Sequence, residues 1–283
     1  MRTIVSRLIQ SHSLPSRLSS EGLLRNGRLL STGSNKVEET FKVEEAETVK
    51  PEAPEPEKVL VLGGNGFVGS HVCKEALQQG LSVSSFSRSG RASIQESWAD
   101  SVVWHQGSLL VQDSLKNAMN DVSAVVSCVG GFGSYSHMYK INGTANINAI
   151  RTAAEQGVKR FVYISAADFG LVNYLLRGYY DGKITAVSLI NLFFAGVILR
   201  PGFIYGTRQV GGLKIPLGVI GSPLEMILQH AKPLNKVPVF GPLLTPPVSV
   251  TAVAKVAVRA ATDQVFPPGI VDVYGILRFS EQK

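Results

Sequence analysis

Four glycines stand within seven positions, directly after a short run of aliphatic residues at 59–62. The run is too short for a helix of its own and is typical of a buried strand. From Phe67 onward the apolar side chains repeat at helical spacing. The pattern therefore predicts a strand, a glycine-rich turn and a helix. The glycines of the turn are Gly63, Gly64, Gly66 and Gly69.

This turn has the chemistry needed to bind the pyrophosphate of a dinucleotide. An early glycine permits the tight exit from the strand, and either Gly63 (GxxGxxG) or Gly64 (GxGxxG) fits that role. Gly66 lets the backbone approach phosphate without a Cβ, and Gly69 lets the helix pack closely on the sheet. The helix N-terminus then presents unpaired N–H groups. The expected binding residues are Gly63, Gly64, Asn65, Gly66, Phe67, Val68 and Gly69.

The second expected strand, at 82–87, indicates which dinucleotide binds. Sheets that prefer NAD carry an acidic residue about 20 positions after the glycines, but no acid occurs between Glu75 and Glu96. The strand ends instead in the sequence SRSGR. Guanidinium groups bind phosphate in a bidentate fork, so Arg88 and Arg91 could hold a 2′-phosphate. We therefore expect NADP(H) rather than NAD(H), with Ser87, Arg88 and Arg91 at the cofactor site.

Strands and helices alternate along the rest of the chain. Further strands are expected at 102–106, 124–129, 160–165 and 197–199, and a helix at 139–155. Such alternation predicts an α/β fold with a doubly wound parallel sheet, whose ligands bind at the carboxyl ends of the strands. The loop GGFGS follows the fourth strand at that edge. We therefore place Gly130 and Gly131 in the cofactor site.

The N-terminal part differs in composition from the rest of the chain. Residues 1–30 hold five arginines, many serines and one acid, which is typical of an organellar transit peptide. We expect import into the mitochondrion, with the chloroplast as the alternative. Residues 31–57 are rich in Glu, Lys and Pro and predict a disordered linker. The expected domain spans 58–275, with 203–247 covering the substrate and 276–283 as a tail.

Composition argues against several other classes of protein. Without residues 1–30 the chain loses five positive charges and one negative charge, so its net charge falls from +7 to +3, and a nucleic-acid partner is not expected. The five histidines show no metal-ligand spacing, so no metal is expected, and Cys73 and Cys128 are expected to be buried thiols. Residues 184–199 fall short of the about 18 needed for a membrane span and predict a helix followed by a buried strand.

Six segments, taken in order, resemble the atypical short-chain dehydrogenase/reductases. They are GGNGFVG, SRSGR, GGFGS, the region YKINGTANINAIRTAAEQGVKRFVYISA, YYDGK and ILRPGFIYG. More narrowly, the chain resembles the mitochondrial branch that includes a dehydrogenase-like protein of coenzyme Q biosynthesis and the Rossmann-fold accessory subunit of respiratory complex I. The resemblance implies a Rossmann fold, a nicotinamide cofactor and a role in ubiquinone metabolism.

The resemblance also implies roles for particular residues. Tyr179 and Lys183 match the motif YxxxK, in which the tyrosine is the general acid/base and the lysine binds the nicotinamide ribose. A spacing of four places both on one helix face, where an ammonium would favour the phenolate. Asn142 matches a helix asparagine of the proton relay. Pro201 and Gly202 match the loop beside the nicotinamide.

The chain departs from the family pattern at two places. The usual serine after the fifth strand aligns with Ser165 or with Ala166, and with Ala166 the catalytic set would be incomplete. After Lys183 the family carries a charged helix, whereas this chain has ITAVSLINLFFAGV. A helix that is apolar all round implies burial, a partner surface or membrane contact.

Two functions follow from these expectations. The first is an NADP(H)-dependent oxidoreductase or auxiliary factor that acts on a quinone or its lipid precursor, with the apolar stretch 211–245 covering the substrate. The second is a nucleotide-binding but non-catalytic subunit of an inner-membrane complex. The fold alone does not choose between them, because Rossmann sheets host many chemistries.

Overall fold

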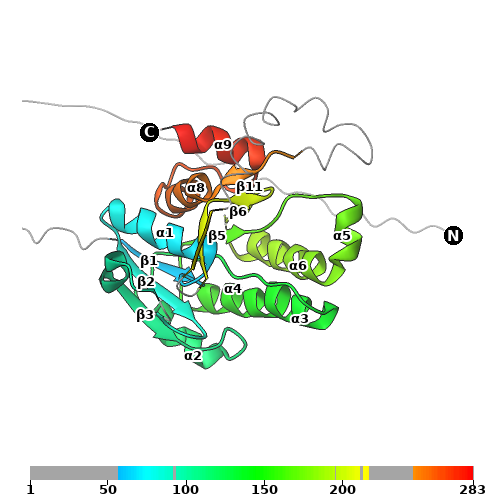
Figure 1. Ribbon diagram of the computed structural model, residues 1–283. Helices are drawn as coiled ribbons and strands as arrows, with labels where there is room; N and C mark the ends of the chain where they lie inside the picture. The colour runs from blue at the N-terminus through cyan, green and yellow to red at the C-terminus, as the bar shows by residue number, and fades with distance from the viewer. Residues whose placement is uncertain (1–56, 92–93, 195, 211–212, 217–244, 283) are drawn as a thin grey trace, which may run out of the picture. The chain divides into compact units, whose positions relative to one another are not determined.

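A seven-stranded parallel sheet forms the centre of the described part of the chain (Figure 1). The computed structural model describes residues 57–91, 94–194, 196–210, 213–216 and 245–282. The strand order is β11-β6-β5-β4-β1-β2-β3. The bounds are β1 (Lys58–Leu62), β2 (Ser82–Ser87), β3 (Val102–Gln106), β4 (Ala124–Ser127), β5 (Arg160–Ile164), β6 (Val197–Arg200) and β11 (Gly269–Asp272).

Helices cover both faces of this sheet (Figure 1). The first face carries α1 (Phe67–Gln78), α8 (Val250–Thr262) and α9 (Val273–Glu281). The second carries α2 (Gln112–Lys116), α4 (Ala145–Glu155) and α6 (Arg177–Phe193), with α3 (Tyr135–Tyr139) beside α6. The order of strands and the two helical layers confirm the doubly wound α/β fold that the alternating pattern predicts.

Shorter elements complete the description. Beside the main sheet lie two small pairs, a parallel one of β7 (Ile204–Tyr205) with β10 (Val248–Ser249) and an antiparallel one of β8 (Thr207–Val210) with β9 (Leu213–Pro216). Three short helical turns are η1 (Ser97–Ser101), η2 (Asn117–Met119) and η3 (Lys140–Thr144), and α5 (Leu171–Leu175) precedes α6. The expected transit peptide, the linker as far as residue 56, and residues 217–244 of the expected substrate cover lie outside the described residues.

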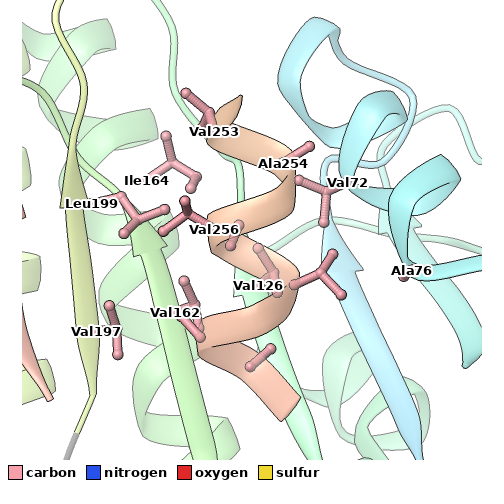
Figure 2. Packing of buried hydrophobic residues seen from close by; sticks show 14 of the residues in the cluster. Val72, Ala76, Val126, Val162, Ile164, Val197, Leu199, Val253, Ala254 and Val256 are labelled. Atoms are coloured by element: carbon pink, nitrogen blue, oxygen red, sulfur yellow. The ribbon is translucent and has the colours of Figure 1, made fainter. Parts of the chain in front are cut away.

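Helix α8 is the main packing element on the first face. Figure 2 shows Val256 of α8 directed at the strands, where Val162 and Leu199 contribute to the same cluster. On its other side α8 packs against α1, whose Val72 is fully buried. The helix begins at a capped N-terminus, because Ser249 accepts a hydrogen bond from the backbone of the first turn. Burial of each valine stabilises the fold by about 1.5–3 kcal/mol.

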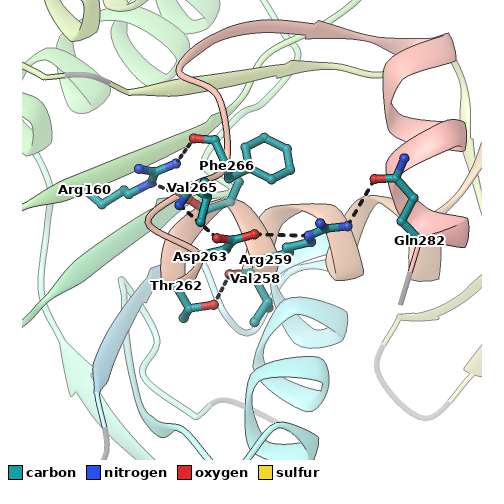
Figure 3. A network of polar contacts seen from close by, with 9 residues as sticks. Arg160, Val258, Arg259, Thr262, Asp263, Val265, Phe266 and Gln282 are labelled. Atoms are coloured by element: carbon teal, nitrogen blue, oxygen red, sulfur yellow. Dashed lines mark hydrogen bonds and ion pairs between the residues drawn. The ribbon is translucent and has the colours of Figure 1, made fainter.

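A polar network ties the C-terminal elements to the start of the central strand β5 (Figure 3). Arg160, the first residue of β5, donates hydrogen bonds to the carbonyls of Ala260 at 2.6 Å and Phe266 at 2.5 Å. Arg259 contacts Asp263 and Gln282, each at 3.4 Å. The guanidinium of Arg160 therefore satisfies two carbonyls at the point where the chain leaves α8.

The C-terminal boundary differs from the expected one. The boundary expected at residue 275 falls inside α9, which continues to Glu281, and Ile276 is fully buried. Strand β11 was also not expected, since its four-residue sequence GIVD offers no apolar run and only Val271 is buried. Residues 276–281 therefore belong to the folded domain and are not a tail.

The apolar segment after Lys183 forms the second half of α6 and leads into β6, as expected. Ala186, Val187 and Ile190 are buried against the sheet, whereas Leu192 is 72% exposed. Among the described helices, none is long and apolar enough to cross a membrane. The helix is thus apolar on its inner face and on part of its outer face.

Candidate functional site

The glycine turn between β1 and α1 has a left-handed residue at its first position. Gly63 has φ +83°, a backbone conformation that favours glycine. Its N–H donates to the carbonyl of Phe86 on β2, and its own carbonyl accepts from Gly66 N–H, both at 2.9 Å. These bonds fix the turn where the first strand ends and the first helix begins.

Two further glycines are required by close packing. A Cβ on Gly69 would overlap the carbonyl of Gly63, and a Cβ on Gly64 would overlap Ser85, whose hydroxyl accepts a hydrogen bond from Gly64 N–H at 3.1 Å. Gly63 is needed for its left-handed backbone and Gly64 for its close contact with Ser85. The motifs GxxGxxG and GxGxxG therefore describe the same turn. A Cβ on Gly66 would meet only the Gly63 carbonyl, at 3.2 Å, which leaves space in front of that backbone.

A cavity of about 260 Å³ lies over this turn. It is lined by the glycine loop, by the end of β2 and by the loop after β4. The residues include Gly63, Asn65, Gly66, Ser87, Arg88 and Gly130. At this cavity the glycine backbone, the N-terminus of α1 and the cation of Arg88 come together. This arrangement fits the pyrophosphate and ribose of a dinucleotide. Phe67, Val68 and Gly69 are the first residues of α1 beneath it.

The two arginines expected at the cofactor site are separated by the structure. Arg88 lines the cavity. Arg91 instead forms an ion pair with Asp100 at 2.7 Å and donates to the carbonyl of Ile94 at 3.2 Å. Asn65 joins the glycine turn to the same loop through a 2.7 Å hydrogen bond to Ser89. Arg88 is therefore the arginine placed to meet a 2′-phosphate, and Arg91 holds the loop.

Asn142 connects the loop after β4 to the helical layer. It is fully buried within the π-helical turn η3, and its side chain donates to the carbonyls of Gly131 and Met138, each at 2.8 Å. Its Oδ1 accepts from Gly131 N–H at 3.3 Å. A Cβ on Gly130 would lie 3.1 Å from that oxygen. Asn142 therefore fixes Gly130 and Gly131, and a π-helical turn often marks a functional position.

Lys183 lies between the cofactor loop and the carboxyl end of β5. Only 4% of it is exposed, and Nζ donates to the carbonyl of Ile164 at 2.8 Å and to the hydroxyl of Tyr163 at 3.5 Å. A Cβ on Gly130 would stand 3.9 Å from this nitrogen. Burial lowers the pKa of Lys183 to about 7. The amine can therefore gain or lose a proton near neutral pH.

Tyr179 adjoins Lys183 but has a different electrostatic environment from the expected one. Its ring centre is 5.1 Å from Lys183 Nζ, and its face stacks on Phe132 at 5.0 Å. Burial, and to a smaller extent Tyr180, raises the pKa of Tyr179 above its usual value. The expectation that a nearby ammonium favours the phenolate is wrong for this structure, because desolvation outweighs any such effect. Tyr179 is a neutral phenol at physiological pH.

The residues after β5 and β6 converge on the other side of Lys183. Ser165 and Ala166 line one small cavity together with Lys183, so both candidates for the family serine lie next to the lysine. Pro201 accepts a backbone hydrogen bond from Ala167 at 2.8 Å. A Cβ on Gly202 would lie 2.8 Å from the carbonyl of Pro246, so this loop packs closely on the segment before α8.

Three residues of the site were not singled out from the sequence. Tyr163 receives a hydrogen bond from Lys183, Phe132 stacks on Tyr179, and Arg200 lines the small cavity. Phe132 lies within the loop GGFGS and Arg200 within the segment ILRPGFIYG. Both residues could therefore have been predicted from the segments that resemble the family. Tyr163 lies in a run of consecutive buried residues in the central strand β5, so nothing in the sequence pattern distinguished it.

The two cysteines lie close to the site but form no disulfide bond. Both cysteines are free; Cys73 is buried, as expected, whereas Cys128 is only partly buried. Desolvation raises the pKa of both thiols, that of Cys128 to about 12. Cys128 also lines the larger cavity. Neither thiol is a reactive thiolate near neutral pH.

A glycine turn at a helix N-terminus, a cavity over it and a buried lysine define the class of nicotinamide-dinucleotide-binding Rossmann proteins. Residues 63–212 match the family described as NAD(P)H-binding. The chain belongs to this family of NAD(P)H-binding proteins. The resemblance read from the sequence is thus confirmed at the level of the family and its fold.

Several known proteins are similar to this chain. An uncharacterized chloroplastic protein of Arabidopsis thaliana is 42% identical over 234 residues, which cover 80% of this chain and 76% of that protein. MIOREX complex component 2 of Saccharomyces cerevisiae is 26% identical over 281 residues, or 78% of this chain and 99% of its own. The Bordetella bronchiseptica enzyme WbmH, solved in complex with NAD⁺, has 19% identity and a TM-score of 0.54 over 76% of this chain and 75% of its own.

Proposed function

We propose that this protein is an organellar NADP(H)-dependent oxidoreductase that reduces a carbonyl or quinone substrate. The observation that carries the proposal is the position of Lys183, buried between the cofactor loop at Gly130, the ring of Tyr179 and the cavity beside Ser165. Structural lysines seldom stay buried without a carboxylate partner. A lysine that binds a cofactor ribose and takes part in proton transfer accounts for this burial.

Arg88 supports the preference for NADP(H). It lines the cavity beside the glycine turn, where a guanidinium would pair with a 2′-phosphate. No Asp or Glu lies between Glu75 and Glu96 to accept the hydrogen bonds of a free 2′-hydroxyl. The charge at this end of the cavity therefore favours the phosphorylated cofactor.

The chain's own residues supply the positioning and the proton. When bound, NADPH supplies the hydride for the reduction. Tyr179 is a neutral phenol, and because burial raises its pKa it holds the proton that it would donate to the oxygen of the reduced carbonyl. Lys183, with a pKa of about 7, can return a proton to the site. Asn142 holds Gly130 and Gly131 and so keeps the cofactor loop in place.

The quinone substrate follows from the sequence resemblance and from exposed aromatic side chains next to the site. Phe132 is 67% exposed while it stacks on Tyr179, and Tyr135 on α3 is 53% exposed. A flat ring can stack on such side chains. We therefore propose a quinone or its lipid precursor, linked to ubiquinone metabolism, as the substrate class.

A specific observation also favours a second function, that of a nucleotide-binding subunit of an inner-membrane complex. Ile184 and Leu192 on α6 are 59% and 72% exposed, and exposed apolar side chains of this kind suit a protein partner. The yeast relative is named as a component of a complex. On this proposal the bound nucleotide stabilises the fold and no turnover occurs.

Calorimetric titration of the full chain with NADPH and NADH, followed by turnover with a short-chain quinone, tests both proposals. Tyr179→Phe is the diagnostic variant, and Tyr174→Phe on the exposed helix α5 is the matched control. Tight NADPH binding with turnover that Tyr179→Phe abolishes supports the oxidoreductase. Tight binding without turnover supports the subunit. Absence of binding to either nucleotide contradicts both.

The proposed organelle is the mitochondrion, on the strength of the Arg-rich and Ser-rich residues 1–30. The Arabidopsis relative is named chloroplastic, so the proposal needs a direct test. A fusion of residues 1–57 to a fluorescent protein should co-localise with a mitochondrial marker. Localisation in plastids would overturn it.

A further inference from the structure

The small cavity beside Lys183 contains a cation that the proposed reaction does not use. It has a volume of about 90 Å³ and lies where β5 and β6 end. Its lining includes Ser165, Asp168, Tyr180, Lys183 and Arg200. This space is large enough for ordered water or for one carboxylate group.

Arg200 is the unpaired cation of this cavity. Within the described part of the chain, no ion pair or hydrogen bond of its guanidinium is found. The other charged groups of the lining are already engaged. Asp168 accepts from Gly170 N–H at 2.8 Å and from Asn173 at 2.6 Å, and Lys183 donates to Ile164 and Tyr163. The donors of the guanidinium are therefore free to meet a ligand.

The lining favours a monoanion over a phosphate. A planar guanidinium matches a carboxylate in a bidentate arrangement. Asp168 places a negative charge in the same wall, which opposes a dianion more than a monoanion. The hydroxyl of Tyr180 already donates to the carbonyl of Ala167 at 3.2 Å. Arg200 is therefore the strongest hydrogen-bond donor in the lining that is still free for a ligand.

We propose that this cavity is an anion subsite in which Arg200 binds a carboxylate of the substrate. The inference rests on the proposed oxidoreductase function and narrows its substrate to a carbonyl or quinone compound that carries an acid group. Lys183 lies between the two cavities, since it lines the small one and stands next to Gly130 of the large one. A carboxylate on Arg200 therefore holds the rest of the substrate beside Lys183 and the cofactor loop.

The test compares benzoate with its neutral analogue benzamide. Both are titrated by calorimetry into the full chain saturated with NADP⁺. Wild-type protein should bind benzoate at least tenfold more tightly than benzamide, and Arg200→Gln should remove that difference. Arg200→Lys should retain part of it, because the charge remains while the planar fork is lost. Arg151→Gln, an equal change of charge on the exposed face of α4, should retain all of it.

The possible results are separable. Equal affinity for benzoate and benzamide, binding of neither at millimolar concentration, or an unchanged preference in Arg200→Gln would overturn the subsite. NADP⁺ binding is measured before benzoate is added. A wild-type protein that does not bind NADP⁺ would contradict the proposed function and not the subsite alone. If Arg200→Gln does not fold, the preference of the wild type and its partial retention in Arg200→Lys decide the question.

Discussion

The side-chain nitrogen of Lys183 lies 5.1 Å from the centre of the Tyr179 ring, while its hydrogen bonds go to the Ile164 carbonyl and the Tyr163 hydroxyl. Burial lowers the pKa of the lysine and raises that of the tyrosine, so both groups are driven towards their neutral forms. In this arrangement the phenol keeps its proton. The site is thus prepared to donate a proton to a product oxygen.

The buried lysine should make stability depend on pH. The pKa of Lys183 is about 7 in the folded protein and 10.5 ordinarily, so the unfolded chain binds more protons between these values. Stability therefore rises with pH in this window, by about 2–3 kcal/mol between pH 7 and 9. We expect Lys183→Met to remove this rise in denaturant unfolding experiments, whereas Lys159→Met, at an exposed site, should keep it. A similar slope in wild type and Lys183→Met would contradict the assignment.

Two glycines of the turn should respond differently to alanine. In Gly69→Ala the new Cβ overlaps the Gly63 carbonyl, so the free energy of unfolding should fall by about 1–3 kcal/mol. In Gly66→Ala the Cβ meets only that carbonyl, at 3.2 Å. The fold should persist, but NADPH affinity should fall at least tenfold because the methyl group blocks the pyrophosphate. Thermal unfolding and calorimetry measure both effects, and full NADPH affinity in Gly66→Ala would refute the turn as the pyrophosphate site.

The two arginines after β2 should contribute to different properties. Arg88→Gln should weaken NADPH binding at least tenfold and leave NADH binding unchanged, because only NADPH carries the 2′-phosphate. Arg91→Gln breaks the ion pair with Asp100, which is 66% exposed. It should cost less than about 1 kcal/mol of stability and leave both affinities nearly unchanged. Equal losses for the two cofactors in Arg88→Gln would rule out the phosphate contact.

Arg160 should contribute more to stability than Arg259. Arg160→Met leaves the carbonyls of Ala260 and Phe266 without a partner (Figure 3), and each loss costs about 1–3 kcal/mol. Arg259→Met removes two longer contacts of 3.4 Å near the surface and should cost at most about 1 kcal/mol. Chemical denaturation of the two variants compares them directly. An equal loss of stability in the two variants would mean that the hydrogen bonds of Arg160 do not hold the chain in place after α8.

Much of the fold could be predicted because central parallel strands have a strong local pattern. Strands β2 and β3 begin and end as expected, and β1, β5 and β6 differ by about one residue. Strand β11 could not be predicted, since it has four residues, starts at Gly269 with φ +113° and buries only Val271. The π-helical turn Lys140–Thr144 was also hidden, because it lies inside the single helix expected at 139–155.

The candidate site was predictable where its chemistry is local. The glycine turn is a contiguous motif, so its residues could be named from their spacing. The difference between Arg88 and Arg91 could not, because it depends on Asp100 in another element. The spacing of Tyr179 and Lys183 gave their proximity, but burial by other segments decides their pKa values. The two residues could be predicted from the sequence, but their protonation states depend on tertiary contacts.

Helix α8 has a consequence for the order in which the chain folds. It comes late in the sequence, yet it packs against α1 and against the central strands β4 and β5. A nascent chain that ends before Val250 leaves the apolar face of α1, including Val72, open to solvent. Contacts of such long sequence separation slow folding and expose aggregation-prone surface. The N-terminal half therefore cannot complete its packing until the last two helices emerge.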